Sequence, residues 1–392
     1  MLKVLHICNN YFGTMLYPEL IDGLSKYGVD NKVLVVLPKS NKAKVLAVLP
    51  KINKVFVPEK TNVTVVWIPN IINIISKVFP ILRVVYIYKL IDVFKNQNID
   101  VIHSHTIHSN GVIGAWLSKI LKVPLVLSGR NVDINIVYKN LFFYRKMILR
   151  RISSNKTIFI NMAYLNFINK EIKIQNIGKE KNKAEVIPNS INSYWFKNKN
   201  QPKQLKSNVV NILFVGECTP NKNIDFLLDV FETQWLSGLL FNVQIIASLD
   251  SKCKDNYKYY AHIKSRVKNI NNIELIGKVT NKELLLKYYR KSDIFFMASF
   301  YETFGLVYAE AMSQGLPIIY TKEQGIDGFY KEGEVGFPVD PRNIEQARSR
   351  IRYVVDNYQK ISQNCLSFVD DFSKEENINK LINTYNDARD NR

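Results

Sequence analysis

Short runs of apolar residues alternate along the chain with longer segments in which apolar and polar residues recur at helical spacing. In the first half, the apolar runs predict strands over residues 3–8, 32–37, 63–67, 101–103, 125–128, 158–162 and 185–187. The intervening segments 17–27 and 110–121 predict helices. Strands that are separated by helices indicate parallel sheets with right-handed crossovers.

The second half repeats this alternation. Its apolar runs predict strands over residues 209–215, 241–247, 273–276, 294–297 and 318–320, with helices over 223–231 and 305–315. A length of 392 residues is enough for about two domains, each with its own core. The pattern therefore predicts an α/β protein with two parallel sheets.

The polar stretch 198–208 lies between the two series of strands and is typical of a linker. It divides the chain into a first domain over residues 1–197 and a second domain over residues 209–370. The remaining residues, 371–392, predict a C-terminal helix that could pack back on the first domain.

The segment from Ser299 to Pro317 is the strongest candidate for a functional site. It joins a predicted strand to a helix that starts near Gly305, and the free N–H groups at such a junction favour phosphate. Glu302 lies in the loop, where it can face a sugar attached to a diphosphate. Glu310 lies on the helix, where it can accept hydrogen bonds from a ribose diol. The alternative is a surface helix with two solvated glutamates.

This segment resembles the donor site of retaining glycosyltransferases of family four, which have the GT-B architecture of two Rossmann-like domains facing across a cleft. The resemblance rests on two glutamates with seven residues between them, on Phe304-Gly305-Leu306, and on Glu310-Ala-Met-Ser-Gln-Gly315-Leu-Pro317. It implies that Glu302 positions the donor sugar and that Glu310 binds the ribose. It also implies that Phe304, Gly305 and Leu306 bind the donor, and that the first domain binds the acceptor.

The turn after the strand 209–215 is the second candidate element, and it reads Gly216-Glu217-Cys-Thr-Pro-Asn-Lys222. In the family this turn usually reads Gly-Arg-x-x-x-x-Lys, and its two cations hold the diphosphate. Gly216 and Lys222 match that pattern, whereas Glu217 stands at the place of the arginine. The resemblance therefore implies a donor-binding and catalytic role for Lys222, unless Lys222 is only an exposed lysine at a helix start.

The third candidate element is the histidine-rich end of the strand 101–103, which reads His103-Ser-His105-Thr-Ile-His108. The family has a comparable histidine near the donor sugar, and His105 matches it best. The resemblance implies a catalytic role for His105, although a single histidine at a strand end is generally structural. Arg130, after the next strand, could either meet an anion of the donor or acceptor or form an internal ion pair with Asp133.

The positive charge of the chain is concentrated in its first half. The net charge is +20, and residues 1–200 hold 29 Lys and Arg against 10 Asp and Glu. Residues 201–392 hold 25 against 24. A genome rich in lysine codons would not explain this asymmetry, so we expect the first half to meet a membrane, a nucleic acid or an acidic substrate.

Two segments of this basic half could lie on a membrane. Residues 71–94 are apolar with spaced cations and tyrosines, and residues 138–156 form a basic amphipathic run. Such helices can lie at the interface of an anionic bilayer. The alternative is a core-facing helix with a solvated basic face.

Other chemistries lack their sequence patterns. The chain has no Asp-x-Asp for a metal-bridged diphosphate, no Gly-x-Gly-x-x-Gly after the first strand, no P-loop and no Gly-x-Ser-x-Gly elbow. Its four cysteines are scattered, which fits reduced thiols in a cytosolic compartment. No signal peptide and no run of about 18 apolar residues is apparent.

Together with the resemblance, these patterns predict a retaining, metal-independent glycosyltransferase without a cofactor. Its donor would be a nucleotide sugar, with UDP as the expected nucleotide, and its acceptor a surface glycan or a lipid-linked precursor. We expect a cytoplasmic protein at the inner face of an anionic membrane, without nucleic acid as a partner. The alternatives are a GT-B nucleotide-sugar epimerase, a glycan phosphorylase, or a non-catalytic basic adaptor for membrane or nucleic acid.

Overall fold

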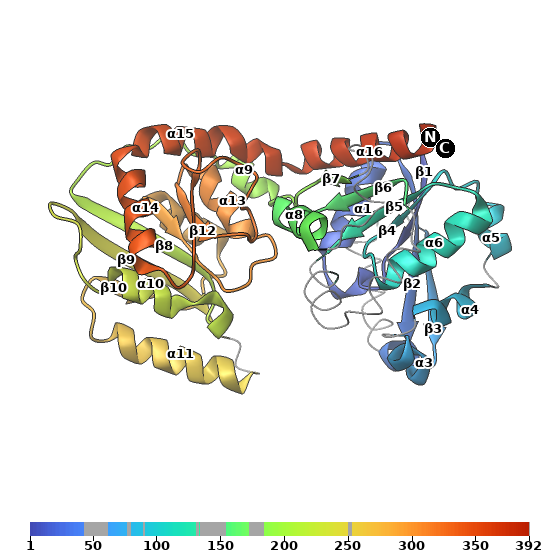
Figure 1. Ribbon diagram of the computed structural model, residues 1–392, viewed down its shortest axis with the longest axis horizontal. Helices are drawn as coiled ribbons and strands as arrows, with labels where there is room; N and C mark the ends of the chain where they lie inside the picture. Colours follow the sequence, from blue (N-terminus) through green and yellow to red (C-terminus); the bar gives the residue numbers. More distant parts are fainter. Residues whose placement is uncertain are drawn as a thin grey trace. The chain divides into compact units, whose positions relative to one another are not determined.

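The computed structural model describes residues 1–42, 62–76, 80–88, 91–130, 133, 154–171, 184–249 and 253–391. The chain forms two compact units (Figure 1). Unit 1 consists of residues 1–160, 164–187 and 375–392, and unit 2 consists of residues 161–163 and 188–374.

Unit 1 is built on a seven-stranded sheet in which all described pairings are parallel, with the order β3-β2-β1-β4-β5-β6-β7. The strands are β1 (Lys3–Ile7), β2 (Asp30–Pro38), β3 (Asn62–Ile68), β4 (Val101–Ser104), β5 (Leu125–Gly129), β6 (Lys156–Phe159) and β7 (Ala184–Val186). The helices are α1 (Leu16–Lys26), α3 (Asn70–Ile75), α4 (Val84–Ile87), α5 (Ile91–Lys95), α6 (Ser109–Leu121), α8 (Met162–Glu171) and α16 (Lys374–Asp390). Short 3-10 turns are η1 (Tyr11–Gly13), η2 (Lys39–Asn41) and η3 (Pro80–Arg83).

Both faces of this sheet are covered. Successive strand residues point to opposite faces, so Val4 of β1 joins one apolar cluster while Leu5 joins another. Every residue of β4 and β5 is buried, as expected for central strands of a parallel sheet. The cluster around Val4 is completed by the C-terminal helix α16 through its apolar residues Ile378, Leu381, Tyr385 and Ala388.

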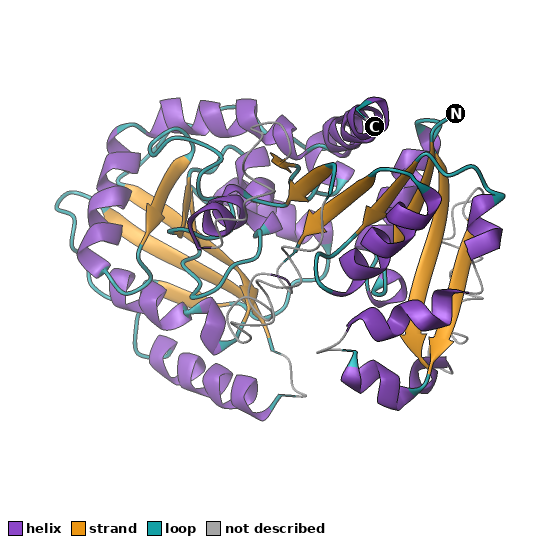
Figure 2. Ribbon diagram, turned by 45° about the vertical axis from the view of Figure 1, so that its right-hand side comes forward, coloured by secondary structure: helices purple, strands orange, loops and turns teal. Residues whose placement is uncertain are grey.

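Unit 2 repeats this plan with a six-stranded parallel sheet of order β10-β9-β8-β11-β12-β13, in which helices lie beside the strands (Figure 2). Its strands are β8 (Val209–Glu217), β9 (Leu240–Ser248), β10 (Ile273–Leu275), β11 (Ile294–Phe296), β12 (Ile318–Thr321) and β13 (Gly336–Val339). Its helices are α9 (Ser193–Lys197), α10 (Ile224–Phe231), α11 (Lys254–Val267), α12 (Lys282–Lys291), α13 (Leu306–Ser313), α14 (Ile344–Asp356) and α15 (Tyr358–Phe368), with 3-10 turns η6 (Pro220–Lys222) and η7 (Val369–Phe372).

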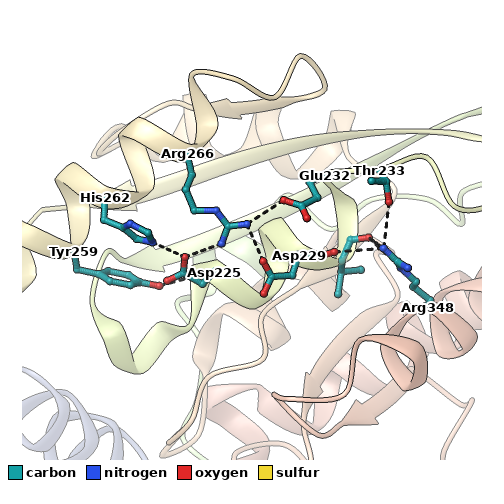
Figure 3. A network of polar contacts seen from close by, with 9 residues as sticks. Asp225, Asp229, Glu232, Thr233, Tyr259, His262, Arg266 and Arg348 are labelled. Atoms are coloured by element: carbon teal, nitrogen blue, oxygen red, sulfur yellow. Dashed lines mark hydrogen bonds and ion pairs between the residues drawn. The ribbon is translucent and has the colours of Figure 1, made fainter.

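Helix α11 packs on unit 2 through the buried Ile263 and the partly buried Tyr259, Tyr260 and Val267, and polar contacts add to this packing. Arg266 of α11 reaches three carboxylates along α10 and its C-terminal end, those of Asp225, Asp229 and Glu232, at 2.7–3.1 Å (Figure 3). His262 contacts the same Asp225 at 2.8 Å. A network of several charges can fix a helix, whereas isolated surface pairs contribute little.

The boundary between the two units lies at Ile187 and Pro188, earlier than the expected linker at 198–208. That polar stretch belongs to unit 2, because its backbone is hydrogen-bonded there. Asn200 N–H donates to the Ser313 carbonyl at 3.0 Å, and Lys203 N–H donates to Ser362 Oγ at 2.9 Å. Polar composition predicted an exposed connection, but its N–H groups find partners on the surface of the unit.

Among the described residues, no helix has the length and apolar character needed to cross a bilayer.

We predict that Leu381→Ala lowers the free energy of unfolding by about 2–4 kcal/mol, because it opens a cavity between α16 and the sheet of unit 1. The exposed Asn379 on the same helix provides the control Asn379→Ala, which should change stability by less than about 0.5 kcal/mol. Urea unfolding measures both variants. Equal stabilities for the two would show that α16 does not close this core.

Candidate functional site

A pocket of about 590 Å³ lies in unit 2 at the carboxyl ends of β8 and β9, where ligands of open α/β sheets bind. The first turn of α13 forms another wall. The lining residues are Asn189, Val215, Gly216, Glu217, Lys222, Ile246, Ser248, Lys278, Val279, Met297, Glu302, Thr303, Phe304, Gly305, Leu306 and Val307. The structure therefore brings together seven of the residues expected from the sequence: Gly216, Glu217, Lys222, Glu302, Phe304, Gly305 and Leu306.

Gly305 makes the entry into α13 possible. It is the N-cap of the helix and has a φ of 73°, a left-handed backbone conformation that is unfavourable for residues with a Cβ atom. A Cβ at this position would also lie 2.3 Å from the Tyr308 ring, which is fully buried. The glycine thus lets the chain turn sharply, and Leu306 and Val307, the first residues of the helix, line the pocket. The N–H groups in the first turn of a helix have no acceptor within the helix.

Lys222 and Glu302 form an ion pair inside this pocket, with Nζ and Oε2 2.6 Å apart. Glu302 is nearly buried, and its other oxygen accepts the Thr303 N–H at 3.1 Å. A charge with so little exposure needs a partner, because burial disfavours an unpaired ion. Lys222 meets that need, and its ammonium group is thereby placed on the pocket wall.

The two loops that carry this pair are tied together by hydrogen bonds between asparagine side chains of one loop and the backbone of the other. The Asn221 side chain donates to the Tyr301 carbonyl at 2.9 Å and accepts the Tyr301 N–H at 3.0 Å. The neighbouring Asn223 has a φ of 53° and donates to the Ala298 carbonyl at 3.3 Å. These contacts explain why Lys222, 80 residues before Glu302, reaches it.

Glu217 and Lys278 add one negative and one positive side chain to the pocket wall. Glu217 is exposed, and no ion pair within the described part of the chain includes it. Lys278 follows Gly277 in the loop after β10, and the sequence reasoning missed it. The signal was available, since Gly277-Lys278 stands after a predicted strand, as Gly216-Glu217 does.

Glu310 lies elsewhere on α13. It is not among the described residues that line the pocket, and its Oε2 accepts a hydrogen bond from the Tyr289 hydroxyl at 3.2 Å. Burial raises the pKa of the Glu310 carboxyl, while hydrogen bonds from Tyr289 and Trp195 oppose that rise. The structure thus brings Glu302 and Lys222 together, but it does not bring Glu310 to their pocket.

His105 lies in unit 1 and is fully buried beside His6 and His103. Asn31 donates its amide to the carbonyls of Ile21 and Val29, so its Oδ1 must accept from His6 Nε2, 2.9 Å away. Neutral His6 then accepts at Nδ1 from His105 Nε2, at 3.0 Å. His105 Nδ1 is left as a buried acceptor without a hydrogen-bond partner among the described residues.

His103 completes this histidine cluster. Its ring contacts the Tyr385 hydroxyl of α16 at 2.6 Å and Ser128 Oγ at 2.7 Å. One nitrogen from each of the three rings lies within 4.8 Å of the others, which is close enough for the three rings to bind one metal ion. Five of the six ring nitrogens already have hydrogen-bond partners, however, so the cluster is satisfied as a polar network within the core.

Arg130 and Asp133 do meet, but through the backbone. Asp133 is fully buried and accepts three N–H groups, from Ile107, His108 and Arg130, at 2.9–3.0 Å. Burial raises the pKa of the Asp133 carboxyl to about 6 despite these bonds. The Arg130 guanidinium carbon lies 5.8 Å from the centre of the Tyr17 ring.

The two parallel α/β units, one with a pocket at the carboxyl edge of its sheet that holds charged side chains, define the class of two-domain α/β proteins. The family pattern described as "Glycosyl transferases group 1" matches residues 195–367, and "Glycosyl transferase 4-like" matches residues 39–162. The chain belongs to this family of GT-B glycosyltransferases and is itself a glycosyltransferase.

Several relatives are similar over most of their length. An uncharacterized glycosyltransferase of Methanocaldococcus jannaschii is 25% identical over 76% of this chain and 78% of its own. The UDP-Gal:alpha-D-GlcNAc-diphosphoundecaprenol alpha-1,3-galactosyltransferase of Escherichia coli is 24% identical over 82% of this chain and 83% of its own. These matches confirm the predicted family and glycosyl transfer as the activity.

Solved structures support the fold. The Anabaena protein HepE, crystallised with UDP, superimposes with a TM-score of 0.64 and 15% identity, covering 98% of this chain and 99% of its own. The two parallel-sheet domains predicted from the sequence are thereby confirmed.

The histidine cluster makes stability depend on pH. Burial lowers the pKa of His6 to about 4 and lowers that of His103 and His105 well below 6.5. Between pH 6.5 and pH 4 the unfolded chain therefore binds more protons than the folded chain, so stability falls as the pH falls. We expect a loss of up to about 1.4 kcal/mol per pH unit for each histidine.

His6→Gln tests this expectation, because glutamine can keep polar contacts but does not titrate. Urea unfolding at pH 7 and pH 5 should show a smaller pH effect for this variant than for the natural chain. His262→Gln, at an exposed histidine of unit 2, is the matched control. An identical pH effect in the natural chain and in His6→Gln would contradict the prediction.

Proposed function

We propose that the protein transfers a sugar from a UDP-linked donor to a lipid-linked or surface-glycan acceptor, with retention of configuration and without a metal ion. The observation that carries this proposal is the Lys222–Glu302 pair in the pocket beside the first turn of α13. A cation and free N–H groups suit a diphosphate, and a carboxylate beside them suits sugar hydroxyls.

Donor binding would begin at the diphosphate. Lys222 would donate to a phosphate oxygen, together with the first N–H groups of α13 next to Gly305. Lys278 supplies a second cation on the same wall, which offsets the negative charge that Glu217 brings to the place of the usual arginine. Phe304 and Leu306 would contact the donor from the same turn.

During transfer, the bond between the anomeric carbon and the diphosphate oxygen breaks while the acceptor oxygen bonds to that carbon. Retention follows if the acceptor approaches on the face that the diphosphate leaves, and the acceptor proton then passes to a leaving phosphate oxygen. Lys222 and the helix N–H groups would stabilise the negative charge that develops on the diphosphate. Glu302 would hold the sugar hydroxyls in place and would not attack the sugar.

UDP is favoured as the donor nucleotide by two comparisons. HepE was crystallised with UDP, and the Escherichia coli relative is named for transfer from UDP-Gal to a diphosphoundecaprenol-linked sugar. The second name also favours a lipid-linked acceptor. The ribose contact of Glu310 and the donor contact of His105 stay predictions.

We expect the protein to associate with an anionic bilayer, because the first half of the chain holds the surplus of lysine and arginine. Most of the basic run 138–156 lies outside the described residues. The segment 71–94 is described in large part.

We predict that Lys222→Met and Lys278→Met each weaken UDP binding by about tenfold or more, because each removes a charge-assisted hydrogen bond to the diphosphate. Lys254→Met, at an exposed lysine of α11 that does not line the pocket, should leave the dissociation constant within about twofold. Isothermal titration calorimetry measures all three variants.

Lys222→Met strands the Glu302 carboxylate, so the double variant Lys222→Met with Glu302→Gln separates lost binding from lost folding. Weak UDP binding in a double variant with natural thermal stability supports the proposal. Natural affinity in both lysine variants would refute the assignment of this pocket to the diphosphate.

We further predict that transfer from the UDP-sugar continues in excess EDTA, because lysines and N–H groups would carry the role that a bridging metal plays elsewhere. Release of UDP in the presence of acceptor is the measurement. Loss of activity in EDTA that Mn²⁺ or Mg²⁺ restores would show that Glu217 or Glu302 acts with a metal ion.

A further inference from the structure

A second pocket of unit 2, with a volume of about 580 Å³, lies at the amino ends of β8 and β11. It is lined by Val209 and Asn211 at the start of β8, by Asp293 just before β11, by the end of α12, and by residues between 200 and 207. The pocket of Lys222 and Glu302 lies at the opposite edge of the same sheet, and the two pockets share no lining residue among those that the structure describes. We refer to the second one as the amino-edge pocket.

Positive charge dominates the amino-edge pocket. Its lining includes four cations and one carboxylate: Lys203, Lys206, Arg290 and Lys291 against Asp293. The carboxylate already has partners, because Asp293 Oδ2 accepts the Asn211 N–H at 2.8 Å and the Asn211 side-chain amide at 3.0 Å. Within the described part of the chain, none of the four cations takes part in an ion pair of 4.0 Å or less. The pocket therefore holds a surplus of positive charge.

Lys203 is the most enclosed of these cations. Its Nζ donates to the Arg290 carbonyl at 3.0 Å and to the Ser292 carbonyl, so it satisfies carbonyl groups at the C-terminal end of α12. An ammonium group has three N–H donors, so one donor remains for a further acceptor. Burial lowers the pKa of the Lys203 ammonium to about 8, while the charge of Asp293 raises it and that of Lys206 lowers it. An anion beside Lys203 would favour its charged form.

Capping of α12 accounts for Lys203 but not for the two neighbouring lysines. Lys206 and Lys291 are exposed, and their ammonium groups make no hydrogen bond to any residue that the structure describes. Arg290, in contrast, is held by Gln314 Oε1 at 3.3 Å and by the Asn198 carbonyl at 3.0 Å. The pocket thus combines a fixed guanidinium, a half-buried ammonium and two ammonium groups that are available to a ligand. Lysine ammonium groups commonly bind phosphate as point charges.

We propose that the amino-edge pocket binds a small phosphate ester, with the phosphate beside Lys203, Lys206 and Lys291. Neutral polar residues of the same lining would accept and donate hydrogen bonds to hydroxyl groups of the ligand: Asn200, Gln201, Gln204 and Ser207. No described lining residue is aromatic, so a sugar phosphate suits the pocket better than a nucleobase that would need a stacking partner. The attraction must come from the side chains, because the C-terminal end of a helix carries partial negative charge.

Isothermal titration calorimetry of the full chain with ribose 5-phosphate tests the proposal, and ribose serves as the uncharged comparison ligand. The natural chain should bind ribose 5-phosphate, and the double variant Lys206→Met with Lys291→Met should bind it at least tenfold more weakly. Both lysines are exposed, so the double variant should fold, which thermal unfolding checks. The matched control is Lys254→Met with Lys258→Met, which removes two exposed charges of α11 and should stay within twofold.

The pocket of Lys222 and Glu302 is the competing site for any phosphate, and Lys278→Met distinguishes the two. This variant should bind ribose 5-phosphate within twofold of the natural chain, and the Lys206 and Lys291 double variant should bind UDP within twofold. Four results would overturn the proposal: no binding by the natural chain, equal binding of ribose and ribose 5-phosphate, equal binding by the double variant and its matched control, or binding that Lys278→Met abolishes and the double variant retains. The last result would place the phosphate in the other pocket.

Discussion

Every strand pairing that the structure describes is parallel, and this constraint decides where polar chemistry can occur in the protein. A parallel sheet needs crossover helices on both faces, so its faces become core and its strand ends remain open. In unit 2 the open ends carry Gly216, Lys222 and the loop of Glu302. The pocket is thus a consequence of the sheet, and its chemistry is a consequence of a few loop residues.

The charged side chains of that pocket determine which interactions a donor diphosphate would have to replace in order to bind. The wall holds two lysines and two glutamates, and one lysine is already paired with Glu302. An incoming diphosphate would have to compete with Glu302 for Lys222, while Lys278 has no ion-pair partner within the described residues. A sugar that offers hydroxyls to Glu302 compensates that carboxylate for the contact it loses. In the proposed donor site, the pair would therefore couple the phosphate end of the donor to its sugar end.

Unit 1 differs in that its apolar core also contains a cluster of buried polar groups, while several apolar side chains are exposed on its surface. The histidines of β1 and β4 form a network in the core that reaches Tyr385 of α16. Burial disfavours a charge on any of these rings, and a proton added at His6 Nδ1 would also set two donors against each other between His6 and His105. On the surface, the isoleucines of α3 are exposed at positions where polar side chains would be hydrated more favourably.

The sequence by itself determined the strands, the two-sheet architecture and the pocket motif, because these depend on local periodicity and on short segments such as Gly305 and its neighbours. The sequence also indicated that Lys222 and Glu302 belong to the site. Each follows a strand of the same parallel sheet, and the carboxyl ends of such strands lie at one edge of the sheet. Tertiary structure alone decided that Lys222 pairs with Glu302, that Lys278 joins them, and that Glu310 turns toward Tyr289. It alone placed His103 against Tyr385 of α16, whereas the packing of a C-terminal helix on the first domain was already expected from the sequence. These outcomes depend on contacts between residues far apart in the chain, and no local pattern records which distant side chain will fill a given space.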